Sequence, residues 1–288
     1  MKSVVAAALL VMASAAPVAA EELQTGGKLL LTGGVSTIEG SGGGGLATWA
    51  TTTGYGAAGE VGGNVHGTWI TLPDFELRSW GAAVGLGDRV ELSYARQTFD
   101  TLDAGALLGL GQGFTFNQDI WGVKVVVLGD AVYDQDRLLP QIAVGAQHKR
   151  NDRGAIITAV GGKDDSGTDY YVAATKLLLD RSLLLNGTVR MTRANQTGLL
   201  GFGGPNNSDY SPQFEGSVAW LASKRLAFGA EYRSKPDNLG LREDDWIDLF
   251  AAYALNKNVS VTAAWVDLGE IATFKDQSGF YISLQAGF

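Results

Sequence analysis

Hydrophobic and polar residues alternate along most of this chain. Val90, Leu92 and Tyr94 fall on one face of their segment, and Glu91 and Ser93 fall on the other. The same two-residue period recurs at 141–147, 185–191, 226–233 and 259–265. A two-residue period is the pleat of a β-strand, whose side chains point alternately to two faces. The pattern therefore predicts strands, not helices.

The alternating segments predict an all-β fold of about fourteen strands. Most are close to the length of about 9–11 residues that a tilted transmembrane strand needs. We expect a single antiparallel transmembrane β-barrel, and the alternative is twelve strands with 27–55 folded as an extra plug or cap. The predicted strands are 27–38, 46–55, 61–72, 75–85, 89–99, 116–128, 139–149, 169–178, 183–193, 214–221, 226–235, 245–255, 259–267 and 279–288.

The connections between these segments alternate in length. Tight turns fall at 86–88, 179–181, 222–224 and 256–258, and long polar stretches fall at 100–115, 150–168, 194–213, 236–244 and 268–278. Short periplasmic turns and longer extracellular loops are typical of outer-membrane barrels. Two connections depart from the pattern, because 129–138 is longer and 73–74 is shorter than it requires.

The first twenty residues are typical of a secretory signal. Lys2 gives a short positive start, 4–16 is apolar or small, and 17–20 supplies small residues for cleavage after Ala20. The apolar run is too short to span a bilayer core of about 30 Å as a helix. We expect residues 1–20 to be a signal peptide and 21–288 to form the barrel, and the alternative is a buried N-terminal helix.

Composition excludes several functional classes. Loss of Lys2 would leave 21 basic residues against 30 acidic ones, so the net charge would change from −8 to −9. This acidity argues against a nucleic-acid partner, which needs clustered basic residues. The absence of cysteine excludes disulfides, thiol nucleophiles and cysteine-ligated zinc. The chain has 40 glycines yet keeps 27 aromatic residues, which suits the strands and bends of a large sheet.

The last strand carries an outer-membrane pattern. Phe280, Ile282, Leu284 and Phe288 share one face, and the chain ends in an aromatic residue. This segment resembles the C-terminal signature of bacterial outer-membrane proteins, which implies recognition by the barrel-assembly machinery. We therefore expect export through the periplasm to the outer membrane of a Gram-negative cell. Outer-membrane lipid and lipopolysaccharide would then be the partners of the barrel surface.

Two segments resemble a particular family. They are Gly-Gly-Lys-Leu-Leu-Leu-Thr-Gly-Gly-Val-Ser-Thr-Ile-Glu-Gly at 26–40 and Gly-Asp-Arg-Val-Glu-Leu-Ser-Tyr-Ala-Arg-Gln-Thr-Phe-Asp at 87–100. The chain resembles the DUF3034 family of uncharacterised proteobacterial outer-membrane proteins. The resemblance covers essentially the whole mature chain and implies fold and location, but no catalytic or binding residues.

Candidate catalytic chemistry is sparse. The two histidines, His66 and His148, lie in no Ser-His motif, and His148 falls on an apolar face near a strand end. Outer-membrane hydrolases need a histidine positioned by a carboxylate or beside a serine. The acidic pairs of the loops lack the spaced oxygen ligands of a calcium site. We expect no catalytic residue, no metal and no cofactor.

The polar face of the strands carries charges of both signs. These residues either line an open lumen or cross-link it as structural pairs, since buried charges must be paired in either case. Many other inward positions are small, which would leave room for a channel. The lumen-facing candidates are Glu91, Lys124, Lys176, Arg190, Glu215, Glu231, Arg233 and Asp248.

The long loop 100–115 is unusually apolar. Leu107, Leu108 and Leu110 are enough for one or two helical turns, and exposed apolar patches usually mark a contact. We expect this loop to fold into the lumen as a gate, and the alternative is that 104–110 extends a strand above the membrane. The expected function is porin-like passage of small solutes or hydrophobic compounds. A structural envelope barrel with a blocked lumen is the alternative, followed by an outer-membrane hydrolase.

Overall fold

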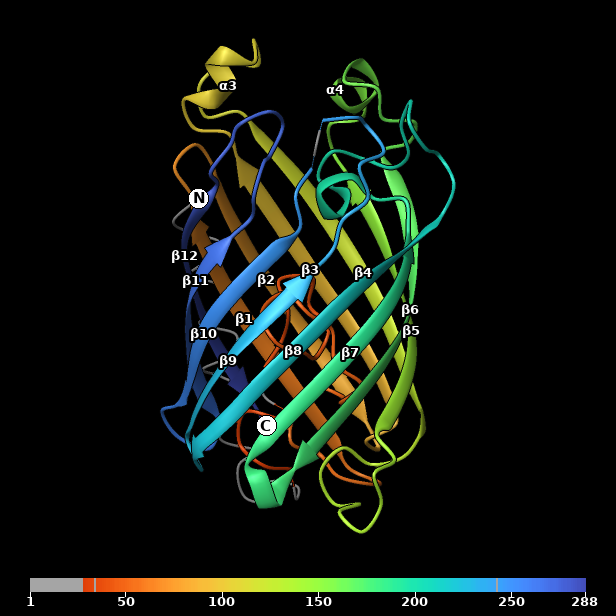
Figure 1. Ribbon diagram of the computed structural model, residues 1–288, viewed down its shortest axis with the longest axis vertical. Coiled ribbons are helices and arrows are strands. Elements are labelled where there is room, and N and C mark those ends of the chain that lie inside the picture. The colour runs from red at the N-terminus through yellow and green to blue at the C-terminus, as the bar shows by residue number, and fades with distance from the viewer. Residues whose placement is uncertain (1–27, 34, 242) are drawn as a thin grey trace, which may run out of the picture.

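The computed structural model describes residues 28–33, 35–241 and 243–288, so the expected signal peptide lies outside the described residues. Within these ranges, twelve antiparallel strands close into one barrel in chain order, with β1 paired to β12 (Figure 1). The strands are β1 (Val61–Thr71), β2 (Glu76–Leu86), β3 (Val90–Asp100), β4 (Thr115–Leu128), β5 (Gln141–Asn151), β6 (Ser166–Leu178), β7 (Leu183–Thr192), β8 (Ser211–Ser223), β9 (Leu226–Arg233), β10 (Trp246–Ala254), β11 (Val259–Asp267) and β12 (Ser278–Gly287).

The all-β barrel is confirmed, with twelve strands and not fourteen. The segments 27–38 and 46–55, predicted to be the first two strands, are wrong as strands where the structure describes them. Residues 35–56 are buried without interruption, whereas a wall strand alternates between an exposed and a buried face. A segment without a lipid-facing side cannot be part of the wall, so the plug alternative is the correct one.

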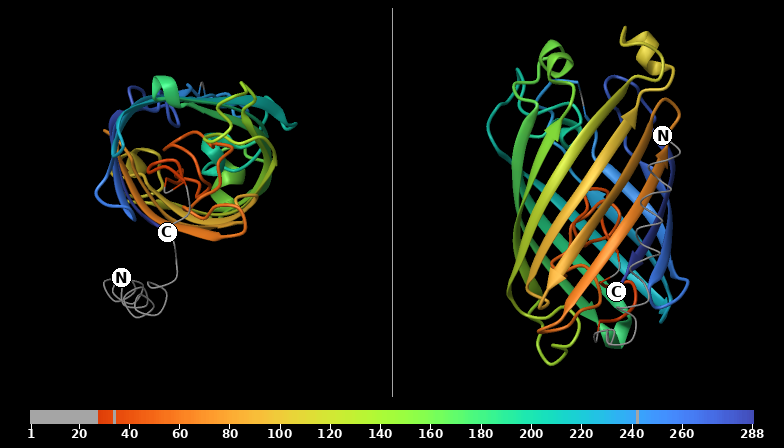
Figure 2. Two further views of the ribbon diagram at one scale, coloured as in Figure 1. Left: turned by 90° about the horizontal axis from the view of Figure 1, so that it is seen from below. Right: turned by 180° about the vertical axis from the view of Figure 1, so that it is seen from behind.

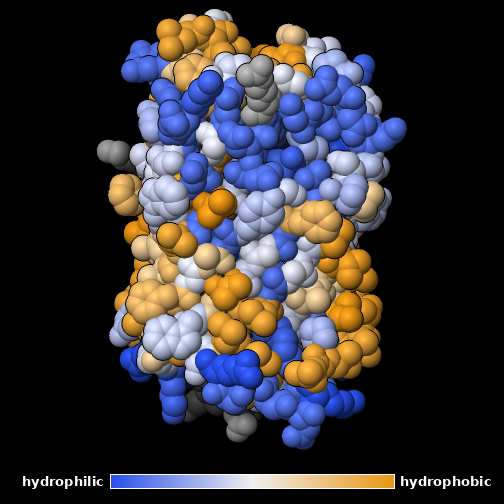
Figure 3. Space-filling view, viewed as in Figure 1, coloured by the Kyte–Doolittle hydropathy of each residue, from blue (hydrophilic) through white to orange (hydrophobic). Residues whose placement is uncertain are grey.

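The outer face of the wall is apolar. Hydrophobic side chains gather in a band between two more polar ends (Figure 3). Trp80, Tyr94, Trp121 and His148 from four adjacent strands form a row of ring contacts on this face, with centroids 5.7–6.1 Å apart. Aromatic side chains are typical of the interfaces of an outer-membrane barrel. No helix among the described residues is long and apolar enough to cross a membrane.

The two ends of the barrel differ in their connections. The tight turns lie at one end, together with the longer link 129–140 and the C-terminal end of β12, while the long loops and the short link 72–75 lie at the other. We call these the inner and outer ends. The outer loops carry α3 (Ala104–Leu107), α4 (Gly154–Ala159) and η2 (Asn195–Gly198), and η1 (Leu179–Arg181) lies at the inner end (Figure 1).

Residues 28–56, the plug, lie inside the ring of strands (Figure 2). Apart from residue 34, the structure describes the whole segment and finds in it no helix and no strand, only isolated bridges such as Ser36 with Gly42. The plug occupies the centre of the lumen, and its side chains contact all sides of the wall.

A second segment, residues 194–203, folds inward from the outer end. We call it the inward loop. Asn195, Gln196, Thr197 and Leu199 in it are buried, and the backbone of three consecutive residues from Gln196 to Gly198 has positive φ angles. The barrel is therefore filled by the plug and covered at its outer end by the inward loop.

Glycine backbones lie in close contact where the end of the plug meets the start of β1. Gly54 has a φ of +77°, and an added Cβ would lie 2.3 Å from the backbone nitrogen of Gly63. Gly59 has a φ of +85° but would place its Cβ in open space. The two positions therefore share the left-handed backbone and differ only in the close approach.

We predict that Gly54→Ala destabilises the barrel more than Gly59→Ala. Both carry the cost of a left-handed alanine, about 1–2 kcal/mol. Only Gly54→Ala adds a steric clash with backbone, worth about 1–3 kcal/mol more. Thermal unfolding in detergent, followed by circular dichroism, measures the difference. Equal shifts in the two variants would contradict the close packing of the plug against β1.

Candidate functional site

The backbone of the plug is hydrogen-bonded by carboxylates of the wall. Three inward glutamates accept hydrogen bonds from backbone N–H groups that have no strand partner. The pairs are Gly42 N and Thr53 N with Glu91 (3.0 and 2.8 Å), Leu46 N with Glu231 (2.7 Å), and Thr48 N with Glu215 (2.8 Å). Hydrogen bonds to an ionised acceptor are stronger than neutral ones. The inward carboxylates thus hold the plug through its main chain.

Basic and amide side chains of the wall hold the plug carbonyl groups. Lys124 Nζ donates to the carbonyl oxygens of Gly42 and Thr51, at 2.9 Å each, and forms an ion pair with Glu91 at 3.2 Å. Neutral groups do the same elsewhere, since Gln97 donates to the Ile38 carbonyl at 3.0 Å. The wall therefore supplies both donors and acceptors to an irregular buried backbone.

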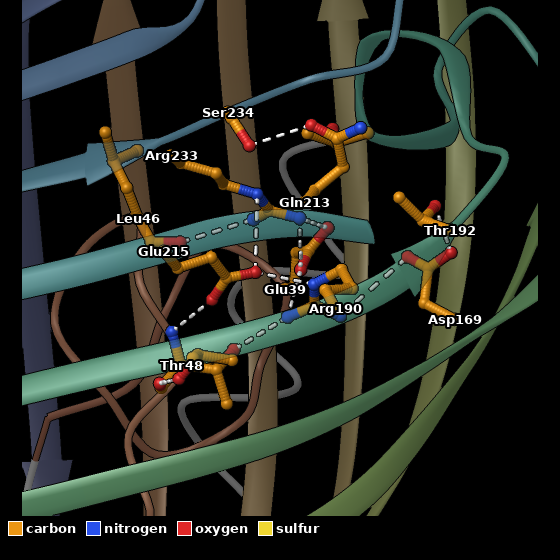
Figure 4. Close-up of polar contacts among 12 residues, drawn as sticks. Glu39, Leu46, Thr48, Asp169, Arg190, Thr192, Gln213, Glu215, Arg233 and Ser234 are labelled. Atoms are coloured by element: carbon orange, nitrogen blue, oxygen red, sulfur yellow. Dashed lines mark hydrogen bonds and ion pairs between the residues drawn. The ribbon is translucent and has the colours of Figure 1, made fainter. Parts of the chain in front are cut away.

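One plug carboxylate, that of Glu39, lies among three cations. Its oxygens are 2.5 Å from Lys149 Nζ. They are 3.0 Å from an Arg233 nitrogen and 3.7 Å from an Arg190 nitrogen (Figure 4). The side chain of Glu39 is fully buried. A buried carboxylate needs such partners, because an unpaired charge in a dry interior is strongly disfavoured.

Two wall carboxylates complete the group. Asp169 lies 2.7 Å from Lys149, and Glu215 lies 2.5 Å from Arg190. Three anions therefore face three cations, and the formal charges cancel. We call these six residues the charge cluster: Glu39, Lys149, Asp169, Arg190, Glu215 and Arg233.

Seven of the eight lumen-facing candidates lie on the interior side of the wall, and all eight are buried. Lys176 does not face the lumen, because it shares the outward phase of Tyr170 and Val172 in β6 and is buried by the link 129–140. Arg190, Glu215 and Arg233 belong to the charge cluster, while Glu91, Lys124 and Glu231 contact the plug. Asp248 accepts a hydrogen bond from the backbone of Glu231 at 3.1 Å. Lys176 lies apart, where its ammonium donates to the carbonyl oxygens of Asp134 and Leu139 in the link 129–140.

Sequence reasoning missed three members of the charge cluster. Lys149 shares the inward phase of Gln147 in β5, and Asp169 shares that of Tyr171 in β6, so the alternation could have placed both. Glu39 could not be found in this way, because the plug has no period. Its partners are more than one hundred residues away in the sequence.

The inward loop is held by a polar group in the loop between β9 and β10. Lys235 Nζ donates to Gln196 Oε1 at 3.0 Å, and the Gln196 backbone N–H donates to Glu243 at 3.2 Å. The Lys235 ammonium also lies 5.0 Å from the ring centre of Trp246. Burial raises the pKa of Glu243 to about 7, and burial lowers the pKa of Lys235 to about 8.

The expected gate loop lies at the outer end and not in the lumen (Figure 1). Leu107 is 80% exposed and Leu108 is 42% exposed, while Leu110 packs against the apolar cluster beneath the loops. The lumen has no space for this loop because the plug and the inward loop fill it. The buried segment at the outer end is 194–203. Its carbonyl groups at Thr197 and Leu199 accept hydrogen bonds from wall side chains.

Neither histidine forms a hydrolase site with a carboxylate. His66 Nε2 lies 3.4 Å from Ser79 Oγ, but this hydroxyl donates to the Ile38 carbonyl at 2.6 Å. His148 is on the outer face and lies 3.0 Å from Thr168 Oγ1. Among the described residues, no group of three or more acidic, histidine or cysteine side chains is placed to hold a metal ion.

The residues of the expected assembly signal face outward from β12 and the chain end. Phe280, Ile282, Leu284 and Phe288 are each between 46% and 75% exposed. The Phe288 carbonyl accepts hydrogen bonds from Tyr55 N and Gly63 N, at 2.8 and 3.1 Å. The chain end therefore presents apolar side chains to the membrane and also anchors the last plug residues.

We predict that Glu39→Gln lowers the free energy of unfolding by about 3–5 kcal/mol, because it leaves one cation of the charge cluster without its balancing charge. Urea unfolding in detergent measures this change. Glu60→Gln makes the same chemical change at an exposed carboxylate, so it is the matched control. A Glu39 variant as stable as the Glu60 variant would show that Glu39 is not needed to balance the cations of the charge cluster.

We predict that the attachment of the inward loop weakens as the pH rises from 5 to 7. The folded pKa of Glu243 is raised to about 7, so its neutral form is favoured at low pH and this stabilisation is lost as the pH rises through 7. Lys235, with a pKa lowered to about 8, is still charged there and partly offsets the loss.

The fluorescence of Trp246, taken as the difference between the native chain and Trp246→Phe, measures this transition. Glu243→Gln should remove the change near pH 7, whereas Glu270→Gln, at the same end of the barrel, should retain it. A transition that persists unchanged in Glu243→Gln would show that another group titrates.

Solved outer-membrane barrels share this fold. A KdgM porin, solved in complex with disordered oligogalacturonate, is 10% identical over 78% of this chain and 99% of its own, with a TM-score of 0.50. A NanC porin is 11% identical over 78% and 98% of the two chains, with a TM-score of 0.47. Outer membrane phospholipase A from Escherichia coli is 11% identical over 82% and 92%, with a TM-score of 0.43. At this identity, the likeness to the KdgM porin shows the fold alone.

The apolar band and the barrel fold together indicate an outer-membrane location. No protein with a curated description matches this chain in sequence. A family model described as protein of unknown function (DUF3034) matches residues 32–285. The chain therefore belongs to the DUF3034 family, as its segments at 26–40 and 87–100 suggested.

Proposed function

We propose that this protein is a porin-like channel that its own plug closes at rest. Small solutes pass after the plug has moved within the lumen or out of it. The observation that carries this proposal is the nature of the contact between plug and wall. It includes many hydrogen bonds and ion pairs, centred on Glu39 and the inward glutamates, beside the apolar packing of Ile38, Leu46 and Trp49.

A polar contact of this kind supports a movable plug. Water can replace each hydrogen bond when the plug leaves, so the net contribution of one such bond is only about 0.5–1.5 kcal/mol. Buried ion pairs likewise stabilise little beyond their own desolvation cost. Ile38, Leu46 and Trp49 of the plug also pack against apolar side chains of the wall, and water does not replace these contacts. The polar part of the contact favours a channel over the structural barrel with a permanently blocked lumen.

The size of the barrel also supports passage once the plug has moved. Eight strands enclose only side chains, whereas 16–18 strands leave an aqueous channel. A barrel of twelve strands lies between these cases, and here the additional space is occupied by main chain of the plug. Its removal would leave a lumen lined with charged and amide side chains, which suits small polar solutes.

A hydrolytic role has less support. The Ser79 hydroxyl beside His66 donates its hydrogen bond to a carbonyl group of the plug, and both side chains are buried. We therefore propose that the protein is not an enzyme. We also propose export by a signal peptide at 1–20, and insertion by the barrel-assembly machinery through the outward face of β12. Lipid and lipopolysaccharide would contact the apolar band.

Planar-bilayer conductance in increasing urea tests the channel. We expect the native chain to conduct little without urea and to open reversibly at concentrations that leave the circular dichroism of the barrel unchanged. Glu39→Gln should open at a lower urea concentration, because its plug is held less tightly. Glu60→Gln should open at the same concentration as the native chain.

Two results would refute the proposal. Full conductance of the native chain without urea would show that the plug does not close the lumen. Absence of conductance at every concentration below barrel unfolding, in both the native chain and Glu39→Gln, would instead support a structural barrel.

A further inference from the structure

An apolar cavity of about 120 Å³ lies at the outer end, between the long loops and the inward loop. Leu199 and Leu200 of the inward loop line it from one side, and Phe75 and Phe99 line it from the wall. Leu108 and Val160, which are 42% and 45% exposed, also line it. The cavity is separate from the charge cluster and from the plug backbone contacts.

The cavity offers almost no polar contact to an occupant. No charged residue lines it, and Thr101 and Gln196 are its only hydroxyl or amide side chains among the described residues. The Thr101 hydroxyl donates to the Phe114 carbonyl at 2.9 Å, and Gln196 accepts from Lys235 at 3.0 Å. Because these groups already have partners, a charged or strongly polar molecule would lose its hydration without compensation.

From these observations we infer that the outer cavity binds a small, uncharged, mostly hydrocarbon molecule. The volume sets the size of this ligand. A protein cavity of about 150 Å³ lined by leucine, isoleucine and phenylalanine binds benzene, so this slightly smaller one suits a single six-membered ring. A cyclic ketone with a six-membered ring meets both conditions, because it is uncharged and mostly hydrocarbon.

This site does not depend on the proposed channel. The cavity is formed in the closed barrel, and binding to it needs no movement of the plug. Failure of the conductance experiment would leave the site intact, and failure of the binding experiment would leave the channel intact.

Titration calorimetry with cyclohexanone tests the site, with protein-free micelles as the blank. Cyclohexanone remains largely in water, so uptake by detergent is small and measurable. We expect saturable binding at one site per chain. Cyclohexylammonium has a ring of the same size but a positive charge, and we expect it not to bind.

Two variants locate the binding. Val160→Trp should abolish binding by filling the cavity. Leu138→Trp, at an exposed leucine in the link 129–140, should leave it unchanged.

Each of the other outcomes would overturn the inference. Absence of saturable binding, or equal binding in Val160→Trp and the native chain, would remove the site. Binding of cyclohexylammonium as tightly as cyclohexanone would contradict the uncharged class.

Discussion

The plug backbone is buried without a hydrogen-bonding ladder, and the rest of the lumen is built around this constraint. A strand satisfies its N–H and C=O groups through its neighbours, but residues 28–56 cross the barrel as irregular chain. Every buried peptide group still needs a partner. The wall supplies these partners from its inward side chains, with glutamates accepting from N–H groups and lysine, arginine and amide groups donating to carbonyls. The inward side chains of this barrel therefore supply the donors and acceptors that one segment of main chain needs.

Charge balance and small side chains follow from the same constraint. Two of the three wall glutamates that accept plug N–H groups have a cation beside them, Lys124 at Glu91 and Arg190 at Glu215. Glu39 lies on the plug and balances cations of the wall, which makes the plug part of the electrostatics of the barrel. Small inward residues serve the plug as well. A Cβ at Gly85 would lie 2.5 Å from the Thr53 carbonyl oxygen, so this glycine provides space for plug main chain and not for a water-filled channel.

The wall could be predicted from sequence because each strand carries its own evidence. Alternation at 90–94 identifies both a strand and the face that bears Glu91, since lipid and lumen impose opposite polarities on adjacent residues. The plug lacks this signal, because it is buried on all sides, and its glycines at 42–45 fit strand and coil equally well. Pairings such as Glu39 with Arg233 join residues 194 positions apart, and no local pattern encodes them. The leucines of 102–114 were recognised as a contact, but their apolar partners belong to several other loops, so sequence could not show which surface would cover them.

Lys149 connects the two segments that close the barrel. Its ammonium donates to Glu39 of the plug at 2.5 Å and to the Thr197 carbonyl of the inward loop at 3.0 Å, and the side chain is fully buried. Movement of either segment would remove one partner of this cation, so the position of one segment affects the interactions of the other. The plug and the inward loop are therefore energetically linked through one side chain. Leu199 and Leu200 of the same inward loop line the outer cavity, so a molecule that stabilises the present position of these leucines also stabilises the closed plug.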